Sequence, residues 1–353
     1  VIVPMSQKQS IIVTGGAGYI GSHTIIELLE QTDFDVISID NYSNSSEKTY
    51  ERIFSITGQQ KRLTHLNINL CHKDELINAF QNINNIAGII HFAAFKSVPE
   101  SVSNPLLYYH NNNESLVNIL YLCKEKNINH FIFSSSCSVY GNIDKLPVTE
   151  DSPFQPAESP YAHTKQIGEE IVKSFTKFTP GFNSVLLRYF NPVGAHKSAK
   201  IGELPLGAPT SLVPIITRTA AGIIKEMHVH GSDYETRDGS CIRDYIHVTD
   251  IADAHIKALD YILKHKNKNN VSLFNLGTGN GVSVFEAINS FEKISGLKLN
   301  YKVGPRRDGD VMAIYANNDL AKKELNWEPK FNIDEMMLSA WKWQQHLSSA
   351  TTN

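Results

Sequence analysis

Tyr161 and Lys165 stand four residues apart, at the start of a segment with the apolar spacing of a helix. Four residues span about one helical turn, so both side chains would lie on one face. Tyrosine, with an ordinary pKa of about 10, is a poor base at neutral pH, and a neighbouring ammonium group lowers that pKa by favouring the phenolate. We therefore expect this pair to accept a proton from an alcohol or sugar hydroxyl.

A serine run, Ser134 to Ser136, lies upstream of this pair, where a buried strand is expected to end. Ligands of parallel sheets bind beyond the carboxyl ends of the strands. Ser136 could therefore hydrogen-bond the reacting oxygen and pass its proton to Tyr161. Alone, a Tyr-x-x-x-Lys match is weak and a serine run is more often a capped loop, but together they predict an acid/base site.

A glycine-rich turn follows the first expected strand, with Gly15, Gly18 and Gly21 at the spacing G-x-x-G-x-x-G. Glycine suits such a turn because the backbone angles are unusual, a pyrophosphate must approach the main chain, and the next helix must pack closely on the strand. The helix N-terminus then offers free N–H groups to the phosphates. The alternative is a glycine-rich turn that holds no ligand.

Asp40 ends the second expected strand. An acid at this place can accept hydrogen bonds from a ribose diol and would repel the additional phosphate of NADP, so the sequence favours NAD. Taken alone, Asp40 could equally be an ordinary turn-initiating residue. Its position after the glycine turn favours the cofactor role.

The elements that must position these residues alternate along the chain. Short apolar runs predict strands near residues 10–14, 35–39, 63–67, 88–92, 130–134 and 183–187, and helical spacing predicts helices at 20–31, 106–126 and 161–178. This rhythm predicts an α/β fold, a doubly wound parallel sheet of the Rossmann type. After Tyr189 the pattern loosens into Gly/Pro-rich loops, a helix over 213–226 and shorter elements.

The length of 353 residues favours two domains. We expect an NAD-binding domain of residues 5–188 plus about 238–270, and a smaller α/β substrate-binding domain of about 189–237 and 271–348. Residues 1–4 precede Met5 and are interpreted as a remnant of cloning.

Composition disfavours several classes of protein. The 33 Lys+Arg and 36 Asp+Glu give a net charge of −3 without a basic run, which argues against nucleic-acid binding. No apolar run approaches the roughly 18 residues of a membrane span. The four cysteines lie far apart, which fits the reducing cytoplasm better than a disulfide framework. His228 and His230 alternate along a strand but have no third ligand nearby, so we expect no metal.

Several longer motifs together resemble the extended short-chain dehydrogenase/reductase family, and within it the branch that epimerises nucleotide sugars at C4. The similarity runs from Ile11 to about Gln345. The motifs are residues 14–21 (TGGAGYIG), 91–94 (HFAA), 134–136 (SSS), Tyr161 with Lys165, 188–195 (RYFNPVGA), 243–248 (RDYIHV) and 306–310 (RRDGD).

The resemblance implies a tightly held NAD that takes hydride from C4 of a UDP-hexose while Tyr161 takes the hydroxyl proton. The 4-keto sugar then turns over and the hydride returns to its other face, which interconverts UDP-glucose and UDP-galactose. A homodimer through the helices at 106–126 and 161–178 is also implied. The implied cofactor residues are Gly15, Gly18, Tyr19, Ile20, Gly21, Asp40, Asn41, Ser45, Asn69, Leu70, Phe92, Ala93, Ala94, Lys96, Asn111, Tyr161, Lys165 and Phe190.

The implied substrate residues are Ser136, Tyr161, Asn191, Ser211, His230, Arg243, Arg307 and Ile314. The residue types themselves support the contacts to the diphosphate. Guanidinium groups such as those of Arg243, Arg306 and Arg307 offer forked donors to such a group. A surface role for these arginines is the alternative.

Four positions depart from the family's usual pattern. Asn69 stands where an Asp commonly contacts adenine, Ser211 where an Asn often contacts the diphosphate, and His230 where an aromatic residue is usual near uracil. Ile314 occupies the position whose size is thought to decide whether an N-acetyl group fits.

Three rival functions remain. A 4,6-dehydratase of the same family needs an Asp-Glu pair after the serine position, where this chain has Cys137 and Ser138. A 4-ketosugar reductase often uses NADP, against which Asp40 argues. A catalytically silent NAD-binding sensor need not keep Tyr161, Lys165 and Ser136 together.

Overall fold

Seven parallel strands form the central sheet of the computed structural model, which describes residues 8–307 and 310–351. Across the sheet they run in the order β10 (Val271–Leu276), β6 (Asn183–Tyr189), β5 (His130–Ser136), β4 (Ile86–His91), β1 (Ser10–Thr14), β2 (Asp35–Asp40) and β3 (Leu63–Asn67). This is the doubly wound order, with β10 added beside β6, so the predicted α/β class is confirmed. The chain order reverses between β1 and β4, which is where such folds bind ligands.

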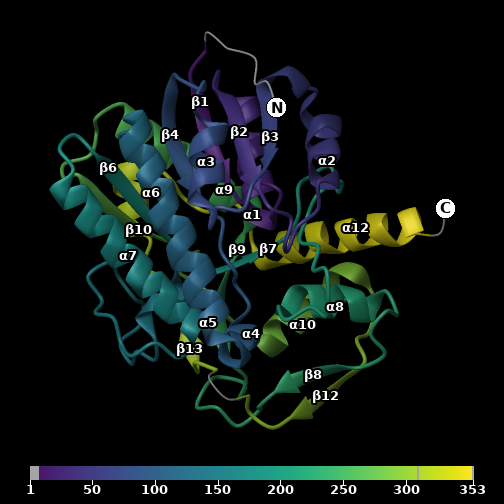
Figure 1. Cartoon of the computed structure of the whole chain (residues 1–353). Helices are drawn as coiled ribbons and strands as arrows, with labels where there is room; N and C mark the ends of the chain where they lie inside the picture. Colours follow the sequence, from purple (N-terminus) through teal and green to yellow (C-terminus); the bar gives the residue numbers. More distant parts are fainter. Residues whose placement is uncertain (1–7, 308–309, 352–353) are drawn as a thin grey trace.

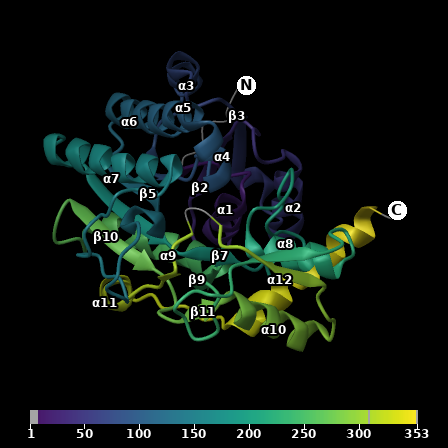
Figure 2. The ribbon, with the colours of Figure 1, turned by 90° about the horizontal axis from the view of Figure 1, so that it is seen from below.

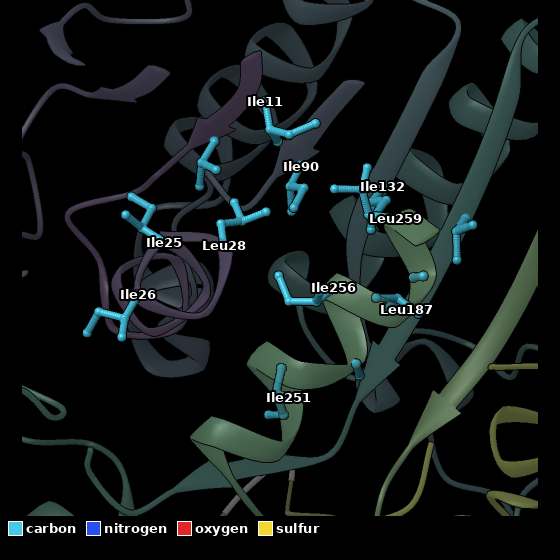
Figure 3. Close-up of a cluster of buried hydrophobic side chains, with 14 of the residues drawn as sticks. Ile11, Ile25, Ile26, Leu28, Ile90, Ile132, Leu187, Ile251, Ile256 and Leu259 are labelled. Atoms are coloured by element: carbon cyan, nitrogen blue, oxygen red, sulfur yellow. The ribbon is translucent and has the colours of Figure 1, made fainter. Parts of the chain in front are cut away.

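Helices cover both faces of the sheet (Figure 1), because the strands carry apolar side chains on both sides. On β1, Ile11 and Val13 belong to one core and Ile12 to the other. Figure 3 shows the first core, where side chains of α1 (Tyr19–Gln31) and α9 (Val248–Leu263) meet those of the strands. This core also includes residues of α2 (Lys48–Thr57) and α11 (Asp319–Leu325), and the second core packs under α3 (Lys73–Ala79), α6 (Glu114–Lys126) and α7 (Pro160–Phe178).

The chain after β6, apart from α9, β10 and α11, builds a second unit beside the carboxyl ends of the large sheet (Figure 2). A four-stranded sheet contains β7 (Asn191–Val193), β9 (Ile242–His247), β11 (Gly281–Ser283) and β13 (Ala313–Ile314), and β8 (Met227–His230) pairs with β12 (Tyr301–Gly304). Helices α8 (Leu212–Ala220), α10 (Val284–Ser295) and α12 (Ile333–Thr351) pack around a third core that includes Phe291 and Met337. This unit faces the ligand-binding edge of the sheet.

The strands and helices predicted from the sequence are present with small shifts. The strands at 10–14 and 63–67 have the predicted bounds, and the other four differ by one or two residues at their ends. The segment predicted as a single helix over 106–126 is divided into α5 (Pro105–Tyr108), a π-helical turn η2 (Tyr109–Asn113) and α6. The remaining short elements are α4 (Val98–Ser103), η1 (Gln60–Arg62) and η3 (Cys137–Tyr140).

Two expectations for the second half are wrong in detail. We assign residues from 271 onward to the smaller domain, but β10 lies in the large sheet, with Val271 opposite Ser184 of β6. As an edge strand whose first three residues are only half-buried, β10 lacks the continuous apolar run of the other strands. The helix expected over 213–226 ends at Ala220, because Gly222 adopts a positive φ of 73° and its N–H bonds to Thr219 O at 3.0 Å.

The expectation for residues 1–4 lies outside the described residues. Within the described part of the chain, none of the helices combines the length and the apolar character needed to cross a membrane.

Candidate functional site

The glycine turn joins β1 to α1 and passes very close to the end of β4. Gly15 has a positive φ of 69°, and a Cβ placed on it would come within 2.8 Å of Ala93 N. Gly18 occupies the N-cap of α1 without a side chain, so the first N–H groups of the helix are open to a ligand. The turn therefore fits the pyrophosphate of a dinucleotide, because its glycines leave the main chain bare where the phosphates would approach.

Asp40 stands at the end of β2 beside this turn. Its carboxylate accepts hydrogen bonds from Ala17 N at 3.0 Å, Tyr42 N at 2.9 Å and Ser45 Oγ at 2.8 Å. Burial raises the pKa of Asp40, and these three hydrogen bonds oppose that rise by favouring the charged form. The carboxylate is thus fixed where a ribose diol would follow a pyrophosphate on the turn.

The start of α7 positions Tyr161 and Lys165. Ser159 caps the helix by accepting from Ala162 N at 3.2 Å, and Pro160 occupies the first helical turn. Lys165 then reaches β5, where its Nζ donates to Ser134 O at 2.7 Å. The structure therefore brings the predicted pair to the end of the strand that carries Ser136.

Burial dominates the ionisation of this pair. It raises the pKa of Tyr161 to about 12, opposed by a hydrogen bond with the Ser136 side chain, and it lowers the pKa of Lys165 to about 8. From the sequence we expect a tyrosine pKa below its ordinary value, but the pKa is raised, so this expectation is wrong. A phenolate would lose its hydration in the buried site, and this effect is the largest.

One pocket of about 920 Å³ joins these groups to the second unit. It is lined by the glycine turn, Asp40 and the acid/base group at one side and by residues of β8, β9 and β13 at the other. Every cofactor and substrate residue proposed above lines this pocket. The individual roles of these residues stay predictions.

Two arginines and an acid lie together at the far end of the pocket. Arg307 donates to Asp310 Oδ1 at 2.7 Å, and the Arg243 guanidinium lies 3.6 Å from the same oxygen. Asp310 was missed from the sequence, although it belongs to the same motif as Arg307. Arg306 behaves differently, because it bonds to Asp233 at 2.9 Å and stacks on Tyr234, which fits the surface role left open for it.

Contacts between the two units close the pocket near α1. Lys96 Nζ donates to Glu203 Oε1 at 2.9 Å, and Ser211 Oγ lies 3.5 Å from the same oxygen. Tyr19 at the start of α1 donates its hydroxyl to Gly194 O at 2.6 Å. Glu203 also lines the pocket and was missed, because its acidic side chain carries no motif signal from the sequence.

The four positions that depart from the family pattern can each be placed in the structure. Asn69 Oδ1 accepts from Cys71 N at 3.1 Å, Ser211 is the N-cap of α8, and His230 is exposed on β8. Ile314 is 6% exposed and pairs in register with Arg243 across β13 and β9. It packs with Phe190 in a small apolar cluster that forms one wall of the site.

One group of possible metal ligands occurs among the described residues, where atoms of Cys71, His110 and Glu114 lie within 4.8 Å of one another. His110 Nδ1 and Glu114 Oε2 already lie 2.7 Å apart. Burial and Glu114 raise the pKa of the Cys71 thiol.

Comparisons with known proteins decide the family. The family model described as GDP-mannose 4,6 dehydratase matches residues 12–339. A UDP-glucose 4-epimerase of Pasteurella multocida is 44% identical over 336 residues, which cover 95% of this chain and 97% of that protein. The chain belongs to the UDP-glucose 4-epimerase family. The resemblance noted in the sequence is thereby confirmed.

Other UDP-glucose 4-epimerases agree in sequence and in fold. The Bacillus subtilis protein is 42% identical over 335 residues, covering 95% of this chain and 96% of that protein. The crystal structure of the UDP-glucose 4-epimerase from Bifidobacterium longum in complex with NAD⁺ and UDP has a TM-score of 0.91 and 43% identity, covering 96% of this chain and 98% of that one.

The glycine turn can be tested by substitution. Gly15→Ala places a methyl group against Ala93 N, where a phosphate must also approach, so we expect the purified protein to carry at least about tenfold less dinucleotide. Gly58→Ala is the matched control: its φ of 66° is similar, but nothing lies within 4 Å of the added Cβ. Both variants should lose about 1 kcal/mol of stability from the positive φ.

Nucleotide released from equal amounts of denatured protein measures the difference between the two variants. Equal retention by Gly15→Ala and Gly58→Ala would show that the turn does not hold the dinucleotide.

Proposed function

We propose that this chain interconverts UDP-glucose and UDP-galactose by NAD-dependent epimerisation at C4. The observation that carries the proposal is the position of Tyr161 and Lys165 in a single pocket, between the glycine turn and the arginines of the second unit. The names and identities of the relatives support it. A nucleotide sugar held by the arginines, end to end with a dinucleotide on the glycine turn, would place its hexose beside the acid/base group.

The residues of the large sheet fit NAD. The glycine turn suits the pyrophosphate and Asp40 suits a ribose diol without a further phosphate. When bound, NAD would take hydride from C4 and return it to the opposite face of the 4-keto sugar. Because the cofactor is regenerated in each cycle, the protein has no need to release it.

Tyr161 would take the proton of the C4 hydroxyl, directly or through Ser136. At neutral pH Lys165 is mostly protonated, because its pKa of about 8 lies above that pH. Its charge, held at Ser134 O, would stabilise the phenolate that forms as the proton moves. Tyr161 would then return the proton after the sugar has turned over.

Arg243 and Arg307 would hold the diphosphate of UDP, since charge-assisted bonds from guanidinium groups are among the stronger polar contacts. Asp310 already bonds to one guanidinium and lies near the other, and so keeps both at the same wall of the pocket. Asn191, Ser211 and His230 would complete this end.

The rival reactions fit the pocket less well. Elimination by a 4,6-dehydratase needs an acid/base pair where this chain has Cys137 and Ser138, and burial raises the pKa of Cys137 to about 12, so that thiol stays protonated. A reductase that uses NADP would have to place a phosphate against Asp40. A silent sensor would bind NAD without turnover, which the experiment below separates.

We further propose a homodimer and a cytoplasmic location. Apolar side chains stand exposed on α4, α5 and α6, among them Val102, Leu106 and Tyr121, and α7 lies beside α6 in both ribbon views (Figures 1 and 2). Covering this face with a second copy would remove it from water. The four cysteines are unpaired in the described structure, as a reducing compartment would keep them.

Incubation of the purified protein with UDP-galactose and no added cofactor tests the reaction. We expect UDP-glucose as the product, formed by the NAD that the protein carries through purification. A 4-keto-6-deoxy sugar would indicate a dehydratase, and binding without any conversion would indicate a sensor. Conversion only after addition of NADP(H) would also contradict the proposal.

The acid/base role is tested by Tyr161→Phe. The ring still packs but the proton acceptor is gone, so kcat should fall by roughly 10² to 10⁴, the usual contribution of a positioned acid/base group. Tyr109→Phe is the control, because it removes an exposed hydroxyl that bonds to His163 on the neighbouring helix. If Tyr161→Phe keeps full activity with NAD bound, the mechanism fails.

Ile314 should set the substrate range. It is smaller than tyrosine but bulkier and stiffer at χ1 than cysteine, so we expect good turnover of UDP-glucose and UDP-galactose and slow turnover of the N-acetyl sugars. Ile314→Tyr should sharpen this preference and Ile314→Cys should relax it, each within the roughly 10- to 200-fold that one pocket side chain contributes. Values of kcat/KM for UDP-galactose and UDP-N-acetylgalactosamine in the wild type and in both variants measure this preference. An unchanged ratio in all three proteins would show that this position does not select the sugar.

A further inference from the structure

A buried ion pair lies directly behind the acid/base group. Glu169 of α7 is completely buried, and Arg188 of β6 is 2% exposed. The guanidinium donates to both carboxylate oxygens, each at 2.7 Å, and Ser135 Oγ donates to Glu169 Oε1 at 2.6 Å. Resting on the proposed function, we propose that Glu169 and Arg188 are positioning residues that keep the ammonium of Lys165 charged and in place for proton transfer.

Glu169 and Lys165 are joined through two neighbouring residues of β5. They stand one helical turn apart on α7. Lys165 Nζ donates to Ser134 O at 2.7 Å, and Ser135 Oγ donates to Glu169. The two contacts fix the same helical turn to the same strand end, so the position of the carboxylate is coupled to that of the ammonium.

The surrounding groups leave this pair as the main source of charge near Lys165. Burial, with a smaller effect of the Lys165 charge, lowers the pKa of His91 on β4 to about 3, so this group is neutral. Burial raises the pKa values of Tyr161 on α7, Cys137 on η3 and Tyr189 on β6, so these groups are neutral as well. Lys173, on α7 one turn beyond Glu169, is 3.3 Å from its carboxylate and partly exposed.

The charge of the Glu169 carboxylate opposes the effect of burial on the pKa of Lys165. Burial lowers the pKa of Lys165, and the charge of Glu169 raises it again. Arg188 in turn lowers the pKa of Glu169, which keeps the carboxylate ionised. Tyr140 OH accepts from Arg188 at 2.9 Å and donates to Asn275 Oδ1 of β10 at 2.6 Å, which anchors the guanidinium to the edge strand.

Packing alone does not explain the pair. Desolvation of two buried charges largely cancels their attraction, so an ion pair of this kind adds little net stability. Its distinct effect is electrostatic, because the charge near Lys165 depends on which member of the pair is present. Loss of Glu169 leaves the positive charge of Arg188 facing Lys165, whereas loss of Arg188 removes the group that keeps the buried Glu169 carboxylate ionised.

The relative size of two shifts therefore tests the inference. In Glu169→Gln the Lys165 ammonium should lose its proton at a pH lower by about one unit or more, because Arg188 remains as an unpaired cation. In Arg188→Gln the shift to lower pH should be smaller, because the buried carboxylate takes up a proton and no cation is left behind. The alkaline limb of the pH profile of kcat for UDP-galactose should move in the same directions. Glu170→Gln is the matched control, because it removes the adjacent, exposed carboxylate that also pairs with Lys173.

A second readout does not depend on turnover. An NMR titration of the holoenzyme labelled with carbon-13 at the lysine ε-carbon reports ionisation of Lys165, whose signal is assigned by its loss in Lys165→Met. If the wild type fails to epimerise, the proposed function fails, while the NMR shifts still decide the inference. A shift to higher pH in Glu169→Gln, or no shift in either single variant, would overturn it.

A double variant covers the case in which either single variant fails to fold. Glu169→Leu with Arg188→Met removes both charges and retains apolar volume, which buried pairs often tolerate. The Lys165 ionisation should then move to lower pH, but by less than in Glu169→Gln. An unchanged ionisation in this variant would show that the pair acts only in packing.

Discussion

The site depends on the burial of a lysine ammonium at the carboxyl edge of a parallel sheet. An unpaired buried charge is costly, so Lys165 must find a partner, and it finds the carbonyl of Ser134. This contact fixes α7 to the end of β5 and places Tyr161 beside Ser136. One helical turn further along α7, Glu169 pairs with Arg188 of β6, and His91, neutral mainly because it is buried, adds no charge beside the ammonium.

The second unit completes the site rather than standing apart from it. Its short strands begin where β6 ends, so Arg243 on β9 and Ile314 on β13 reach the pocket from the side opposite the glycine turn. Tyr19 and Lys96 bond across to this unit. The pocket is lined by residues of both units, as a dinucleotide and a nucleotide sugar held end to end would require.

Much of this arrangement could be predicted from the sequence, because local patterns determine it. The β-branched run of β1 and the glycines that follow it are local signals of a strand and a tight turn, and the predicted pair on α7 lies where helical spacing put it. The edge strand β10 was missed because its pairing with β6 depends on contacts far along the chain. The direction of the Tyr161 pKa shift was missed because it depends on burial, which no motif reports.

The path of the hydrogen at C4 tests the central claim most directly. UDP-galactose labelled with deuterium at C4 and with carbon-13 throughout the hexose is mixed with unlabelled UDP-galactose and converted in ordinary water. Hydride removal and return within one closed pocket predicts that deuterium stays at C4 and in the same molecules as the carbon-13. Loss of deuterium to water, or its appearance in unlabelled product, would contradict the account.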